Sequence, residues 1–194
     1  MQNNIRVKLA VFSILEGKLV IHGDNHLPVT DLKKRESLDS CVSELFDNAT
    51  GNTLSDFYSE QLYTVDHPFS VVYFALIPHF QILNKVAVFK PINSHKFGHP
   101  DAEIVSYALQ RLQWKIEYTN VVYSLLPDEF TLSELQTVYE AILNKKLDKR
   151  NFRKKMLSLG LLTSSGRKKK GVKARPAEIY TFKSRNPQIV KIFS

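Results

Sequence analysis

The feature that most constrains the fold is a pair of short amphipathic helices, each with its own start signal. Thr131 and Glu134 have the spacing of a capping box, in which a hydroxyl and a carboxylate satisfy the free backbone N–H groups at a helix start. Asp148 is a suitable N-cap for a second helix, and Gly160 is a suitable stop after its last turn. These signals predict a compact helical module in this part of the chain.

The second helix of this pair has two chemically distinct sides. At about 100° per residue, Phe152, Met156 and Leu159 fall on one side. The opposite side is basic and carries Arg150, Arg153 and Lys154. A three-turn helix with an apolar back and a basic front, arriving soon after another helix, is the layout of a helix-turn-helix recognition helix.

A basic segment follows this helix and predicts a wing. Short strands are expected at residues 161–163 and 179–182, and a glycine-punctuated loop is expected between them. A basic run can also be a merely solvated loop, and no aromatic residues are interleaved that would stack single-stranded bases. The helix and the wing together favour double-stranded DNA, because cations neutralise phosphates and a helix fits the major groove.

The residues that we expect to contact DNA come from both features. Arginine or asparagine would read base edges, and lysine would meet phosphates. On the helix they are Lys149, Arg150, Asn151, Arg153 and Lys154, and in the wing they are Arg167, Lys168, Lys169, Lys170, Lys173 and Arg175.

The distribution of charge supports two modules with different partners. Residues 1–126 carry 11 basic and 13 acidic side chains, whereas residues 127–194 carry 16 basic and 6 acidic side chains. The second module therefore suits a polyanion such as DNA.

The first part of the chain has a mixed pattern of strands and helices. Residues 6–14 alternate in hydropathy and lead through a tight turn at Glu16 and Gly17 to a second strand, as in a hairpin. Further strands are expected at 71–77 and 86–89, and helices at 37–48 and 102–118.

Residues 130–162 and 175–182 resemble the winged-helix half of the Nudix-related transcriptional regulators, and residues 99–127 resemble the segment that joins the two halves of those proteins. The resemblance implies an α+β protein: a Nudix-like mixed-sheet sandwich at 1–124, followed by a winged helix-turn-helix domain at 125–194. It also implies a bacterial DNA-binding regulator that binds a double-stranded operator, whose first domain senses a small-molecule effector, and that forms a homodimer.

The active-site motif of Nudix enzymes is broken in this sequence. The motif G-x5-E-x7-R-E-U-x-E-E-x-G-U, with U a bulky apolar residue, supplies the carboxylates that hold divalent cations against a diphosphate. One alignment places the first glutamate of the motif at Glu36 and its late glycine at Gly51. The first glycine of the motif then falls on Thr30, its arginine on Glu44, the next glutamate on Leu45, and the glutamate pair on Asn48 and Ala49. A shift of one residue restores Glu44 but leaves only Asp47 and Asn48 for the glutamate pair. We therefore expect no enzymatic activity.

Two other functions remain as alternatives. One is an active Nudix hydrolase of an ADP-ribose-type nucleoside diphosphate, and the other is a winged helix that binds an acidic protein. For the effector, the loss of the metal-binding carboxylates favours a sugar or sugar derivative slightly over ADP-ribose. The sequence does not identify effector-binding residues.

Other candidate sites are weak. Cys41 is the single cysteine, excludes a disulfide framework, and lies on the apolar side of its expected helix. His95 and His99 lack a third ligand nearby, so we expect no zinc and no other metal or cofactor. The absence of a signal peptide or an apolar run long enough to span a bilayer predicts a cytoplasmic protein with no membrane partner.

The expected helix at 102–118 has a broad apolar side, on which Tyr107, Trp114 and Tyr118 add to the core stripe. We expect this helix and the first domain to form the dimer, although the same residues could pack within their own domain.

Overall fold

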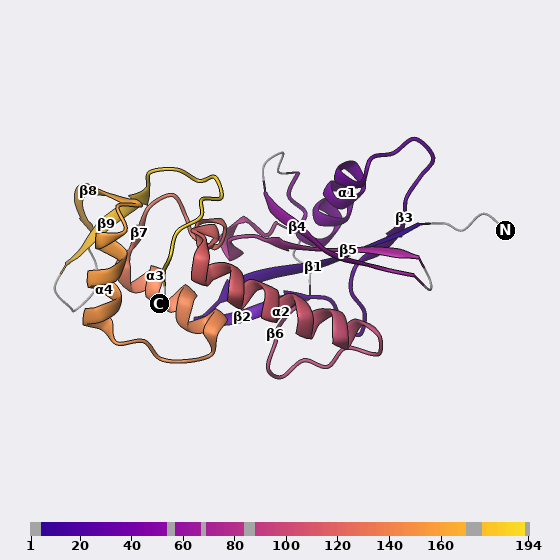
Figure 1. The fold of residues 1–194 in the computed structure, drawn as a ribbon, viewed down its shortest axis with the longest axis horizontal. Coiled ribbons are helices and arrows are strands. Elements are labelled where there is room, and N and C mark those ends of the chain that lie inside the picture. The colour runs from indigo at the N-terminus through magenta and orange to yellow at the C-terminus, as the bar shows by residue number, and fades with distance from the viewer. Residues whose placement is uncertain (1–4, 54–56, 67–68, 84–87, 170–175, 193–194) are drawn as a thin grey trace. The chain divides into compact units, whose positions relative to one another are not determined.

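The computed structural model describes residues 5–53, 57–66, 69–83, 88–169 and 176–192. The chain divides into two compact units, Met1–Arg111 and Leu112–Ser194. The division falls within helix α2 (Asp101–Tyr118), which is continuous in Figure 1. The domain boundary expected at residue 124 stays a prediction. Within the described ranges, no helix combines the length and apolar character that crossing a membrane requires.

The first unit is built on a six-stranded mixed sheet, as Figure 1 shows. The strands follow the order β4-β5-β1-β2-β6, and β3 pairs with β1 beside this path. Their bounds are β1 Arg6–Leu15, β2 Lys18–His22, β3 Val29–Asp31, β4 Tyr58–Val65, β5 Ser70–Leu76 and β6 Phe89–Pro91. β1 runs parallel to β5 and antiparallel to β2. Together with the helices, this sheet confirms the predicted α+β class.

The turn between β1 and β2 is the tight hairpin that the sequence predicted. Leu15 pairs with Lys18, so Glu16 and Gly17 alone make the turn. Both have positive φ, 49° and 73°, as a type I′ turn requires.

Helix α1 (Leu38–Thr50) covers one face of this sheet. Ser37 caps its start by accepting a hydrogen bond from the Ser40 N–H, and Gly51 ends it in the left-handed conformation. Cys41 and Phe46 are fully buried against β1 residues that include Leu9, which confirms the predicted core position of Cys41.

The first turns of α2 also belong to this unit. Asp101 is 2% exposed and accepts hydrogen bonds from the Lys8 ammonium and from the Leu27 N–H. Ile104 and Ala108 on the same helix are buried. These contacts anchor the start of α2.

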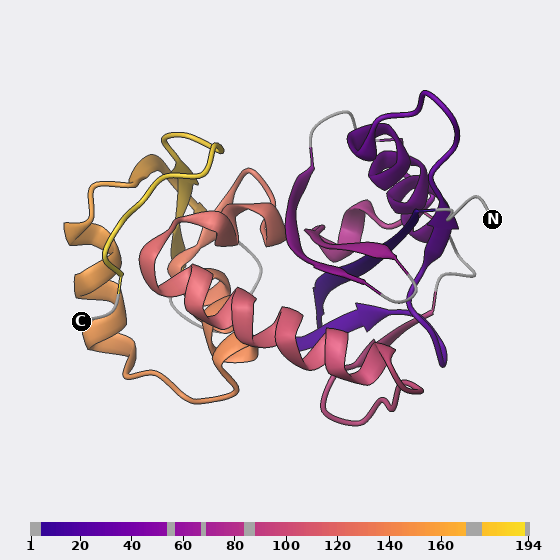
Figure 2. The same cartoon turned by 45° about the vertical axis from the view of Figure 1, so that its right-hand side comes forward.

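The second unit contains the predicted helix pair and hairpin (Figure 2). Its elements are η2 Val121–Leu125, β7 Phe130–Thr131, α3 Leu132–Leu143, α4 Lys149–Ser158, β8 Leu162–Lys169 and β9 Ala177–Phe182. The three strands form a small sheet in the order β7-β9-β8.

All three signals at the helix ends are confirmed. Thr131 and Glu134 form both hydrogen bonds of the capping box, and Asp148 accepts a hydrogen bond from the Asn151 N–H. Gly160 follows α4 with a φ of 68°.

Several strands differ from the prediction. β3 and β7 were not predicted, and β6 covers Phe89–Pro91 where a strand was expected at 86–89, of which residues 86 and 87 lie outside the described residues. β8 continues through Lys169 instead of ending at residue 163, because cross-strand pairing with β9 resumes after a bulge at Gly166, whose φ is 70°. Arg167, Lys168 and Lys169 therefore lie on a strand and not in the predicted loop. β4 was not predicted, because this half-exposed edge strand is rich in polar residues.

Candidate nucleic-acid interface

Helix α4 presents the basic side that the sequence predicted. Phe152 and Met156 are buried, and the Phe152 ring packs edge-on against Tyr139 of α3 at a centroid distance of 5.4 Å. The predicted contact residues of the helix are all exposed: Lys149, Arg150, Asn151, Arg153 and Lys154. The apolar back thus fixes the orientation of the helix, and the basic front faces solvent.

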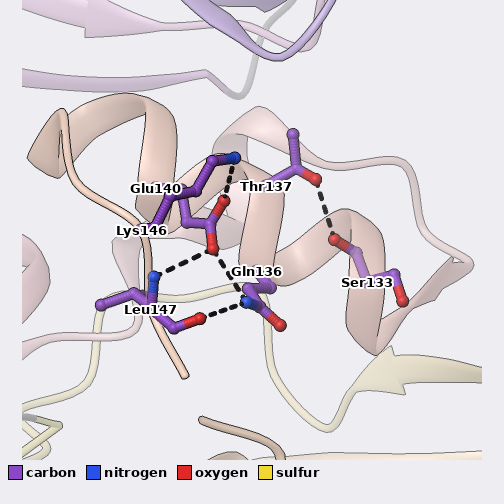
Figure 3. Close-up of polar contacts among 6 residues, drawn as sticks. All are labelled: Ser133, Gln136, Thr137, Glu140, Lys146 and Leu147. Carbon is purple, nitrogen blue, oxygen red and sulfur yellow. Dashed lines mark hydrogen bonds and ion pairs between the residues drawn. The ribbon is translucent and has the colours of Figure 1, made fainter. Parts of the chain in front are cut away.

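The turn between α3 and α4 is held by one carboxylate, as Figure 3 shows. Glu140 Oε1 accepts hydrogen bonds from the Leu147 N–H at 3.0 Å and from Gln136 Nε2 at 2.8 Å. Its Oε2 accepts a hydrogen bond from Lys146 Nζ at 2.7 Å. Gln136 Nε2 also donates to the Leu147 carbonyl at 2.9 Å. Side chains of α3 therefore set where the chain enters α4.

The electrostatics of this turn follow from the same contacts. The hydrogen bond from Lys146, together with that from the Leu147 N–H, lowers the pKa of Glu140 to about 2. The Glu140 side chain is only 14% exposed, whereas the Lys146 side chain is 92% exposed. Glu140 is thus an ionised acceptor that stays in place at neutral pH.

The wing residues divide between the two faces of β8. Arg167 and Lys169 are two residues apart and share one face of the strand, and Lys168 points to the other face. Lys168 lies directly opposite Glu178 of β9, and Glu178 also forms an ion pair with Arg153 of α4. Among the described wing residues, Lys168 is therefore the one on the same face of the sheet as α4.

Three of the predicted wing residues cannot be placed. Lys170, Lys173 and Arg175 lie outside the described residues.

The ion pairs of three acidic residues in this region were not predicted from the sequence. Each forms an ion pair with a predicted DNA-contacting residue: Glu129 with Arg167, Glu134 with Lys169, and Glu178 with Arg153. Their partners are distant in sequence, so only the alternation along β8 and its pairing with β9 could have suggested them.

The residues that were aligned with the Nudix motif lie on helix α1 and in the segments beside it, and they do not fit a pair of divalent cations. Glu44 forms an ion pair with Lys33 at 2.7 Å, and the Glu36 carboxylate accepts a hydrogen bond from the Lys33 N–H. Burial raises the pKa of Asp47, which disfavours the ionised form that a cation needs. Among the described residues, no group of three His, Cys, Asp or Glu side chains could hold a metal ion.

An exposed basic face on the second helix of such a pair suits the major groove of DNA, and the basic hairpin beside it completes a winged helix. These features place the chain in the winged-helix class of DNA-binding proteins.

Comparisons with known proteins agree with this class. Residues 122–182 match the family described as the NrtR DNA-binding winged helix domain. The chain is 30% identical over 206 residues to the ADPR-responsive transcriptional repressor NtrR of Acinetobacter baylyi, covering 91% of this chain and 80% of that protein. The crystal structure of Shewanella oneidensis NrtR with a 27mer DNA matches with a TM-score of 0.78 and 25% identity, covering 92% of this chain and 93% of that one.

A second structure shows the fold alone. It is a MutT/nudix family protein from Enterococcus faecalis, with a TM-score of 0.71 and 18% identity, covering 95% of this chain and 89% of that one. The chain belongs to the NrtR family of Nudix-related transcriptional regulators. The predicted family, the Nudix-like fold with a winged helix, and the role in transcription regulation are thereby confirmed.

Proposed function

We propose that this protein is a transcriptional repressor that responds to ADP-ribose. In this proposal residues 125–194 bind an operator, and residues 1–124 bind the effector. The 30% identical relative is an ADPR-responsive transcriptional repressor, which supports ADP-ribose as the effector and repression as the effect on transcription. It favours ADP-ribose over a sugar.

The observation that supports DNA binding is the exposed basic side of α4. The orientation of α4 is fixed by the buried Phe152 and by the hydrogen bonds of Glu140 in the preceding turn. We propose that the helix enters the major groove and that β8 contacts the flanking phosphates. The proposed contacts are Lys149, Arg150, Asn151, Arg153, Lys154, Arg167, Lys168 and Lys169, with Lys170, Lys173 and Arg175 proposed from the sequence alone.

This interface can be tested with a duplex selected by the protein from a random pool, here called the selected duplex. Arg150→Ala should weaken binding to it by about 1–3 kcal/mol if Arg150 makes a bidentate base contact. Lys183 is exposed and lies outside the proposed set, so Lys183→Ala is the matched control. Unchanged binding by Arg150→Ala and Arg153→Ala together would contradict the assignment of α4.

We also propose that the first unit binds ADP-ribose without hydrolysing it. The ion pair of Glu44 with Lys33, the raised pKa of Asp47 and the apolar Ala49 support this proposal. An assay of ADP-ribose with Mg²⁺ or Mn²⁺ should give only background release of products. Metal-dependent turnover at ordinary enzyme rates would instead favour the hydrolase alternative.

The assembly and the location of the protein complete the proposal. A homodimer would place two winged helices on the half-sites of a pseudo-palindromic operator. Exposed aromatic side chains on α2 support a protein contact there, because Trp114 is 46% exposed and Tyr118 is 37% exposed. As a regulator of bacterial genes, the protein would act in the cytoplasm.

A further inference from the structure

Glu178 is a carboxylate fixed inside the proposed DNA interface. Its Oε1 accepts a hydrogen bond from Ser164 Oγ at 2.5 Å, and its Oε2 accepts one from the Tyr180 hydroxyl at 2.8 Å. Arg153 of α4 lies 4.0 Å from Oε2, and Lys168 lies directly across the sheet. The hydroxyl hydrogen bonds lower the pKa of Glu178, so it carries a negative charge at neutral pH between two proposed DNA contacts.

Glu134 of α3 supplies a second carboxylate, which contacts Lys169 on the other face of β8. Its Oε2 accepts hydrogen bonds from the Thr131 N–H at 2.7 Å and from the Thr131 hydroxyl at 3.0 Å. Its Oε1 accepts a hydrogen bond from Lys169 Nζ at 2.5 Å. The capping box therefore fixes the carboxylate that binds this wing lysine.

Negative charges at these positions oppose the approach of any polyanion. A phosphate that binds Arg153 or Lys169 must first replace a carboxylate that is already in place. Every duplex offers phosphates, and each ion pair must be given up on a matched and on an unmatched site alike. The carboxylates thus lower the affinity for both kinds of DNA.

We propose that Glu134 and Glu178 limit the affinity for DNA by holding Lys169 and Arg153 in ion pairs that any duplex must replace. This inference rests on the proposed function, since it requires that α4 and β8 form the DNA interface. It assigns to two acidic residues a role in weakening the complex with DNA.

The test compares the selected duplex with a scrambled duplex of the same length and composition, using the full chain. Glu178→Gln and Glu134→Gln remove one charge each and keep hydrogen-bonding capacity, and glutamine is also accepted in a capping box. Each variant should bind both duplexes about two- to fivefold more tightly, the range expected for exposed ion pairs. The ratio of the affinities for the selected and the scrambled duplex should therefore stay nearly constant. The salt slope on the scrambled duplex should steepen by about one unit.

Asp128→Asn is the matched control for charge alone. Asp128 is 88% exposed and pairs with Arg185, which is not a proposed DNA contact. Asp128→Asn should therefore tighten binding to the scrambled duplex clearly less than Glu178→Gln does. Equal tightening by Asp128→Asn would overturn the proposal.

A double variant separates a specific ion pair from a general effect. In an Arg153→Gln background, Glu178→Gln should tighten binding to the scrambled duplex clearly less than it does in the wild type. A full effect in that background would also overturn the proposal. If Arg150→Ala with Arg153→Ala leaves the selected duplex bound, the DNA interface itself is wrong. If those changes abolish binding but the glutamine variants bind both duplexes as the wild type does, only the role of the carboxylates is wrong.

Discussion

Glu140 Oε1 accepts a hydrogen bond from the backbone N–H of Leu147, seven residues later in the chain, at 3.0 Å. The last turn of α3 is thereby tied to the residue before the N-cap of α4. The contact explains how a turn with no regular secondary structure can fix the direction of the proposed DNA-binding helix.

Removal of the Glu140 carboxylate should loosen this turn. Glu140→Ala leaves the Leu147 N–H and Gln136 Nε2 without their shared acceptor, so we expect weaker binding to the selected duplex and a lower melting temperature. Glu140→Gln keeps one acceptor oxygen and should recover part of both. Fluorescence anisotropy and circular dichroism measure the two effects, and wild-type values for Glu140→Ala would show that the turn does not depend on the carboxylate.

The lowered pKa of Glu140 predicts that part of the folding stability is lost in acid. The pKa of Glu140 is lowered from 4.5 to about 2, so its contribution to stability is present above the higher value and is lost as the pH falls through the lower one. The stability advantage of the wild type over Glu140→Gln should therefore be constant above that window and shrink within it. Thermal unfolding over a pH series measures the advantage, and one that does not change with pH would refute the role of this charge.

Arg185 should contribute to stability and not to DNA reading. Its guanidinium donates hydrogen bonds to the carbonyls of Tyr123, Leu126 and Pro127 at 2.6, 2.7 and 3.2 Å. Arg185→Ala removes these three hydrogen bonds and should cost about 2 kcal/mol of unfolding free energy. Denaturant unfolding measures this loss, with Lys183→Ala as the control. A stable variant with strongly reduced binding to the selected duplex would place Arg185 in the interface instead.

The dimer is tested at Trp114, which is exposed on α2. Trp114→Glu places a charge within the proposed contact and should convert the dimer to a monomer in light scattering. Leu157→Glu adds the same charge at an exposed apolar residue of α4, outside the first domain and α2, and it should leave the mass unchanged. A monomeric wild type, or a dimeric Trp114→Glu variant, would count against this interface.

Local signals in the sequence predicted the helical part of the DNA-binding unit. Thr131, Asp148 and Gly160 act on backbone groups within a few residues of themselves, so their effect can be read from short stretches of sequence. Helix periodicity likewise separated the buried Phe152 from the exposed Arg153.

Contacts between distant segments could not be predicted in this way. Lys169 and Glu134 are separated by 35 residues, and their ion pair depends on how β8 pairs with β9. The bulge at Gly166 carries β8 past a glycine that sequence patterns treat as a strand end. The role of Glu140 was missed for the same reason, since its partners become apparent only when the turn is formed.

The most direct test of a ligand-responsive repressor is the affinity of the full chain for the selected duplex with and without saturating ADP-ribose. The proposal predicts that ADP-ribose weakens the complex, and that the duplex weakens ADP-ribose binding by the same factor, because coupling between two sites is reciprocal. An affinity for the selected duplex that is the same with and without bound ADP-ribose would contradict the proposal.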